Sequence, residues 1–101
     1  MTRYIRIVSL WIQPGQEAAF EAFERDAVRI MVRHGGRIDS AVRVGGEGDR
    51  PFEVHLVSFP DPAAADSYAA DPETQSLRTR RAAIIARTTV LEGREAGPYR
   101  P

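Results

Sequence analysis

The sequence predicts an α+β fold in which helices cover one face of a four-stranded antiparallel sheet. The hydrophobic pattern alternates between strand-like and helix-like stretches in the order β-α-β-β-α-β. The 101 residues suit one domain, and 43% hydrophobic with 28% charged residues is typical of a globular chain. We therefore expect a single domain over residues 1–93 and a C-terminal tail over 94–101.

Residues 4–12 predict the first strand, because they are rich in β-branched and aromatic types and are followed by a Pro-Gly pair. Both of its faces are largely apolar. One face carries Tyr4, Val8, Leu10 and Ile12, and the other carries Ile5, Ile7 and Trp11. A strand that is apolar on both faces is usually covered on both sides.

Residues 16–34 predict a long helix. Its apolar positions recur three and four residues apart and lead to His34 on the same face. Acidic residues are concentrated in its first half and basic residues in its second, which suits the helix dipole. Gly35 and Gly36 end the helix and turn the chain into the next strand.

Residues 37–44 and 52–59 predict two strands joined by a glycine-rich loop. We expect one face of the first to carry Ile38, Ser40, Val42 and Val44, and the other face to carry Arg37, Asp39 and Arg43. The loop glycines lead into a strand and not a helix, so a hairpin is favoured over a phosphate-binding loop.

The C-terminal half predicts a broken helix and a last strand. Asp61 can cap a helix over 62–70 with Pro62 at its first position, a second helix follows over 73–84, and residues 85–92 form a strand. The complete order is that of the ferredoxin-like plait. Its helices leave one sheet face bare, so we expect a face-to-face homodimer that closes into an α/β barrel.

Composition excludes several classes of function. The net charge is zero, which argues against binding nucleic acid, and no apolar run is long enough to span a membrane. There is no cysteine and no lysine, which excludes thiolate nucleophiles and lysine Schiff bases. We expect a cytoplasmic protein that needs no cofactor and takes a small molecule as its ligand.

The two histidines are the main candidates for catalysis. His34 can act as a base, although a cation at a helix C-terminus is explained by the dipole alone, and this structural role is favoured. His55 lies mid-strand, and a buried hydrogen-bonded histidine is as reasonable there as a catalytic one. Glu53 points the same way as His55. No metal-ligand spacing supports a metal site formed by these three residues.

Arg81 is the third candidate, because it shares a helix face with Leu77 and Ile84. We expect it to pair with Glu53 or Asp39, or with an anionic substrate, whereas the neighbouring Arg78 and Arg80 are expected in solvent. Further substrate-binding candidates are Arg37, Glu53 and two aromatic residues that are more often part of a core, Trp11 and Tyr68.

Three segments resemble the DUF1330 family of the dimeric α/β-barrel (ABM-like) superfamily: RHGGRI, SFPDPAAADSYAADPETQSLRTRRAA and ARTTVLEG. The resemblance covers residues 4–93. It implies dimers with sheets packed face to face and a cleft between each sheet and its helices. Members of the superfamily include cofactor-free monooxygenases, isomerases, polyketide cyclases, haem-handling proteins and binding proteins.

The sequence departs from these relatives in two respects. Thr74 stands where an aromatic residue is usual, and the absence of asparagine removes the residue that the quinone-forming and haem-degrading members use. Trp11 without an asparagine is not sufficient to expect the monooxygenase mechanism in this chain. Two functions remain open: a cofactor-free isomerase, cyclase or monooxygenase acting on a small aromatic or polyketide-like molecule, and a non-catalytic or stress-associated binding dimer.

Overall fold

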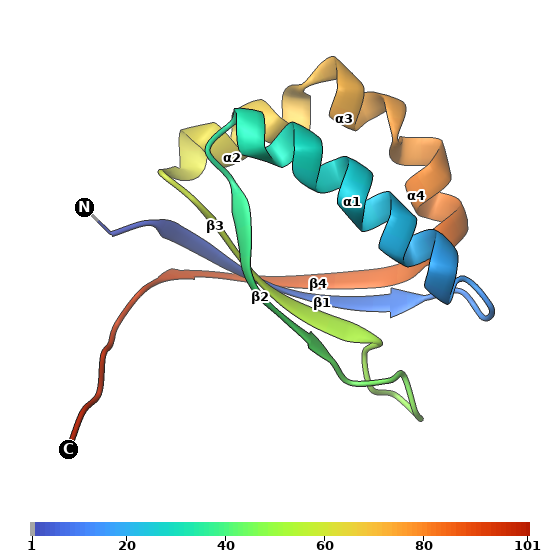
Figure 1. The fold of residues 1–101 in the computed structure, drawn as a ribbon, viewed down its shortest axis with the longest axis horizontal. Coiled ribbons are helices and arrows are strands. Elements are labelled where there is room, and N and C mark those ends of the chain that lie inside the picture. Colours follow the sequence, from blue (N-terminus) through green and yellow to red (C-terminus); the bar gives the residue numbers. More distant parts are fainter. Residues whose placement is uncertain (1) are drawn as a thin grey trace.

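The computed structural model describes residues 2–101 and contains the expected four-stranded antiparallel sheet (Figure 1). Its strands are β1 (Tyr4–Ile12), β2 (Arg37–Arg43), β3 (Glu53–Phe59) and β4 (Ile85–Arg94). They lie in the order β2-β3-β1-β4, so β1 and β3 are central. The fold class predicted from the sequence is confirmed, and β4 extends one residue into the predicted tail, whose remainder leads away from the sheet.

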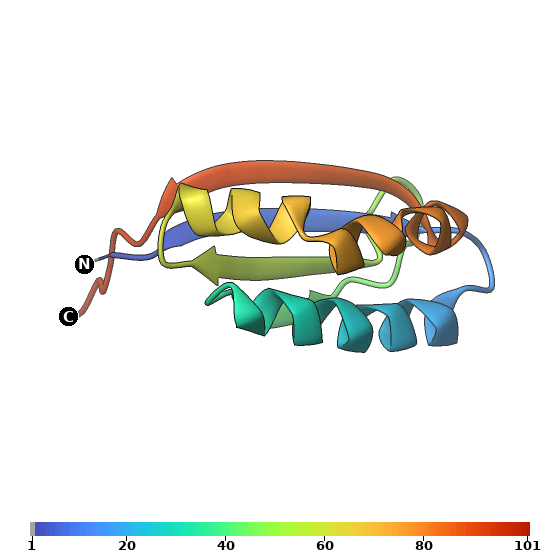
Figure 2. The same cartoon turned by 90° about the horizontal axis from the view of Figure 1, so that it is seen from above.

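The helices α1 (Glu17–Arg33), α2 (Pro62–Ala70), α3 (Pro72–Ser76) and α4 (Arg78–Ile84) all cover the same face. Figure 2 shows α2, α3 and α4 following one another in a row, with α1 beside them. The helix expected over 73–84 is divided at Leu77, whose N–H bonds to the carbonyl of Thr74. This three-residue turn is tighter than an α-helical turn and redirects the chain.

The start of α2 follows from local sequence chemistry. The Asp61 side chain accepts a hydrogen bond from the backbone N–H of Ala64 at 2.8 Å, and Pro62 occupies the first helical position. The helix end at Gly35 and Gly36 is equally local. Gly35 has a φ of 74°, and a Cβ on Gly36 would collide with Met31 and Phe59. Only glycine gives this turn both its backbone angle and its close packing.

The core fills the space between the sheet and the helices. One cluster is centred on Phe20, Phe23 and Leu10, and a second on Met31, Val57 and Phe59. The opposite face of the sheet is uncovered and exposes large apolar side chains at Ile7, Val42, Leu56 and Leu91.

The predicted faces of β2 are wrong. Ile38 pairs with Val57 and Ser40 pairs with Leu56, so Asp39 is an extra residue and forms a β-bulge. A bulge reverses the alternation of every side chain after it. Ile38 therefore faces the helices together with Arg43, whereas Val42 is on the open face.

No helix within residues 2–101 is long and apolar enough to cross a membrane.

Candidate functional site

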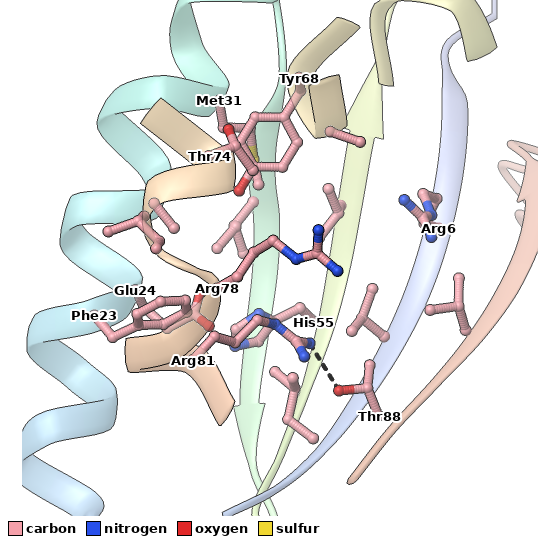
Figure 3. A pocket seen from close by; sticks show the side chains of 18 of the residues that line it. Arg6, Phe23, Glu24, Met31, His55, Tyr68, Thr74, Arg78, Arg81 and Thr88 are labelled. Atoms are coloured by element: carbon pink, nitrogen blue, oxygen red, sulfur yellow. Dashed lines mark hydrogen bonds between the residues drawn. The ribbon is translucent and has the colours of Figure 1, made fainter. Parts of the chain in front are cut away.

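A cavity of about 300 Å³ lies between the sheet and the helices (Figure 3). Its wall is largely aliphatic and aromatic, with contributions from all four strands and all four helices. The polar side chains in the wall are those of Arg6, Glu24, His55, Tyr68, Thr74, Gln75, Arg78, Arg81 and Thr88. A mainly apolar cavity with a few polar groups is the usual form of a small-molecule site.

His55 is the histidine in this wall, and it is held by a carboxylate. Alternation along β3 places Glu53 and His55 on the same face, where Nε2 of His55 lies 2.7 Å from Oε1 of Glu53. The second oxygen of Glu53 accepts a hydrogen bond from Nε of Arg43 at 2.6 Å. This bond holds the pKa of Arg43 above its usual value. His55 is 3% exposed and Glu53 is 8% exposed, so the pair is buried.

Three arginines reach the same cavity from two elements. Arg6 comes from β1, and Arg78 and Arg81 come from α4. Figure 3 shows the guanidinium of Arg78 extending toward the sheet in the direction of Arg6, while Arg81 donates to Oγ1 of Thr88 at 2.8 Å. The expected pairing of Arg81 with Glu53 or Asp39 is absent from residues 2–101, because those carboxylates bind Arg43 and Arg37. Arg78 is exposed, as expected, and its side chain also lines the cavity.

Burial changes the acid–base character of two further groups in the wall. It raises the pKa of the Glu24 carboxyl, and His55 and Arg81 offset this only in part. It also raises the pKa of the Tyr68 hydroxyl, with Glu24 adding to the effect. A carboxyl shifted in this way is more readily protonated than one in water.

His34 lies outside the cavity. Its position at the C-cap of α1 brings Nε2 within 2.7 Å of Oδ2 of Asp71, and the Asp71 side chain caps the start of α3. The hydrogen bond from His34, followed by that from the backbone N–H of Glu73, lowers the pKa of Asp71. This contact joins the end of α1 to the α2–α3 junction and gives His34 a structural role.

The remaining predicted residues divide between the two faces of the sheet. Tyr68 lines the cavity, with its ring centroid 5.7 Å from that of Phe59. Trp11 is on the open face, where the guanidinium carbon of Arg87 lies 4.3 Å from its ring centroid. Arg37 is also outside the cavity and forms an ion pair with Asp39 at 2.6 Å.

Sequence reasoning missed Arg6, Arg78, Glu24 and Thr74. Arg6 carried a usable signal, because it is a charged residue on the apolar face of a central strand, between Tyr4 and Val8. The other three lie on helix faces that also contact solvent. Within residues 2–101, no group of three or more His, Cys, Asp or Glu side chains is arranged to hold a metal ion.

Comparison with solved structures shows a widespread fold. The chain superposes on a Pseudomonas aeruginosa protein with a TM-score of 0.75 at 15% identity, covering 96% of this chain and 97% of that one. It matches a dabb family protein with a ferredoxin-like fold from Mesorhizobium loti at 0.67 and 18% identity, over 96% and 100% of the two chains.

A candidate antibiotic biosynthesis monooxygenase from Bacteroides thetaiotaomicron also matches, with a TM-score of 0.67 and 20% identity over 98% of this chain and 91% of that one. A scan against models of protein families and a search of curated proteins found no significant match. Identities this low relate folds and not activities. The chain therefore has the same ferredoxin-like fold as these solved structures.

Proposed function

We propose that this protein is a cofactor-free enzyme that transfers a proton on a small aromatic or polyketide-like molecule bound in the cleft. One observation carries the proposal: a buried histidine, held by a buried carboxylate, lines a mainly apolar cavity. A positioned imidazole is the commonest general base. The cavity is at the lower end of the volume range of ligand sites, about 300–1,000 Å³, which suits a molecule with one or two rings.

In this proposal each ring nitrogen of His55 has its own role. If Nε2–H donates to Glu53, the lone pair is on Nδ1, and Nδ1 can take a proton from a carbon next to a carbonyl group. The C–H electron pair then forms a C=C bond while the carbonyl π pair moves onto the oxygen, which gives an enolate. In this proposal the guanidinium of Arg81 stabilises that oxygen. Return of the proton from Nδ1 to a different atom of the enolate completes an isomerisation. Attack by the enolate carbon on a second carbonyl, with the proton passing from Nδ1 to the new alkoxide, gives a cyclisation.

Deuterium exchange tests this chemistry without knowledge of the natural substrate. Phenylpyruvate, benzoylacetone and acetylacetone are carbon acids of suitable size, and their exchange in D₂O can be followed by proton NMR. We expect the protein to accelerate exchange of at least one of them. His55→Gln should lower the rate by about 10²–10⁴-fold, the usual contribution of a general base. His34→Gln is the matched control, and we expect it to retain the rate.

A second candidate function is binding without catalysis. It is favoured by the enclosure of His55, whose ring lies 6.3 Å from that of Phe20 and whose Nε2 is already bonded. If no carbon acid exchanges faster with the wild-type protein than with His55→Gln, the binding role replaces the enzymatic one.

We further propose that the protein is a homodimer in the manner of the DUF1330 family, with the open sheet faces packed together. Support comes from the exposed apolar residues on that face, among them Leu56, 38% exposed, and Leu91, 68% exposed. Covering such a patch removes apolar surface from water. Light scattering should report a dimer at micromolar concentration. Leu56→Arg with Leu91→Arg should give a monomer, whereas Val32→Arg, at an exposed apolar site on α1, should not.

A further inference from the structure

We infer that the ligand of this cleft is an organic anion: a carboxylate on an apolar, ring-bearing body, with Arg6, Arg78 and Arg81 binding the charged group. The inference rests on the binding part of the proposed function and names its ligand class. It does not depend on proton transfer.

The charges around the cavity are unbalanced. Arg6, Arg78 and Arg81 line it, and Glu24 is the one carboxylate in its wall among the described residues. Three positive charges therefore face one carboxylate, whose pKa is raised by burial. None of the three arginines forms an ion pair within residues 2–101, whereas Arg80 on the same helix pairs with Asp26 at 2.6 Å. An anion would supply the missing charge.

The hydrogen-bond donors are also incompletely used. Nε of Arg6 is buried and has no hydrogen-bond partner within residues 2–101. Glu92, which lies opposite Arg6 in the sheet, accepts from the hydroxyl of Tyr4 instead. A buried donor without a partner is costly, so the site gains when a ligand oxygen reaches it. Oγ1 of Thr74, in the same wall, is unpartnered too.

The bonds that Arg78 and Arg81 make are to neutral groups. Arg78 donates to the amide oxygen of Gln75 at 3.0 Å, and Arg81 donates to Thr88. Each can exchange or share such a bond with a carboxylate, because a guanidinium binds an ionised acceptor in a bidentate pair more strongly than a neutral oxygen. Arg78 and Arg81 are exposed residues on the helix side of the cavity, and Arg6 is half-buried on its sheet side (Figure 3).

The apolar residues of the cavity wall indicate that the uncharged part of the ligand is apolar. Met31, Phe59 and Tyr68 form one end of the cavity, together with aliphatic residues of β1 and β3. These side chains offer contact area and few hydrogen bonds. An inorganic anion would use the arginines and leave this apolar end unfilled. A ring-bearing carboxylate satisfies both ends.

An isosteric pair of compounds provides the test. 3-Phenylpropionate and 3-phenylpropanamide differ in charge but hardly in shape, and neither undergoes the exchange reaction used above. Their affinities are measured by NMR titration of backbone amide signals of the cavity wall, with the Arg6 Nε–H signal as a further probe in the proteins that retain Arg6. The variants are Arg6→Gln and Arg78→Gln, and the matched control is Arg80→Gln.

We expect the carboxylate to bind at least about tenfold tighter than the amide, with its affinity falling as salt is added. Arg6→Gln and Arg78→Gln should each weaken carboxylate binding by about tenfold, and Arg80→Gln by less than about twofold. If Arg6→Gln does not fold, Arg78→Gln decides the result.

Equal affinities of acid and amide, no binding of the acid, or an equal loss with Arg80→Gln would overturn the inference. If inorganic phosphate binds as tightly as the acid, the claim that the ligand has an apolar body is refuted. Anion selectivity without deuterium exchange would leave this inference standing and refute proton transfer. Deuterium exchange without anion selectivity would support proton transfer and refute this inference.

Discussion

Replacing Glu53 by alanine should destabilise the fold far more than replacing any exposed carboxylate. The substitution removes the acceptor of two short hydrogen bonds, one from His55 at 2.7 Å and one from Arg43 at 2.6 Å. Arg43 is half exposed and also contacts Glu21 at 3.3 Å, so water and Glu21 can replace its lost partner. His55 is 3% exposed and has no such replacement.

The size of the effect follows from this difference. Leaving the buried His55 donor without its acceptor costs about 1–3 kcal/mol, whereas Arg43 is re-solvated at little cost, so we expect a total of about 3 kcal/mol. For a domain of this size, about 4–8 °C per kcal/mol corresponds to a fall in Tm of about 12–24 °C. Glu53→Gln should cost less, about 1 kcal/mol, because its amide can bond to both partners once the His55 proton moves to Nδ1.

The assay is thermal and urea unfolding followed by circular dichroism at one protein concentration, since the Tm of a dimer depends on concentration. Glu21→Ala is the control. It removes an exposed partner of the same arginine and should cost less than about 0.5 kcal/mol. A loss for Glu53→Ala no greater than for Glu21→Ala would refute the view that the carboxylate supports a buried histidine.

Three further outcomes are expected. Gly36→Ala should cost about 1–3 kcal/mol by overpacking, whereas Gly93→Ala, which has open space, should cost less than about 0.5 kcal/mol in the same urea titration. Asp61→Ala should lose about 1 kcal/mol of helix capping, and Asp61→Ser should restore most of it. Burial raises the pKa of Glu24 in the folded state above its ordinary value of 4.5. At a pH between the ordinary and the raised pKa, the folded state holds a proton that the unfolded state has lost. The contribution of Glu24 to the free energy of unfolding should therefore be constant below that window and fall as pH rises through it, and unfolding titrations across pH should show that Glu24→Gln removes this fall.

The secondary structure could be predicted because its signals are local. The cap at Asp61, the glycine stop after His34 and the periodicity of α1 each depend on neighbours within a few residues, and the structure places these elements where the sequence predicts them. The division of the second helix at Leu77 was not predicted at that residue, because no proline or glycine marks it.

The site could be predicted only in part. The pairing of Glu53 with His55 follows from alternation along one strand and was anticipated as a possibility. The bulge at Asp39 was not, because an extra residue in a strand depends on the register against β3. That single residue turned Arg43 toward Glu53 and removed Glu53 as a partner for Arg81.

The sequence by itself determined the order of elements, the uncovered apolar face and the supply of side chains for chemistry, since these depend on composition and short-range periodicity. Only the tertiary structure decided which of these side chains share a cavity. Arg6 lies more than 70 positions before Arg78, and their approach depends on how α4 packs against a central strand. His34 ended against Asp71 and His55 against Glu53, so two histidines that are equivalent as residue types have different roles.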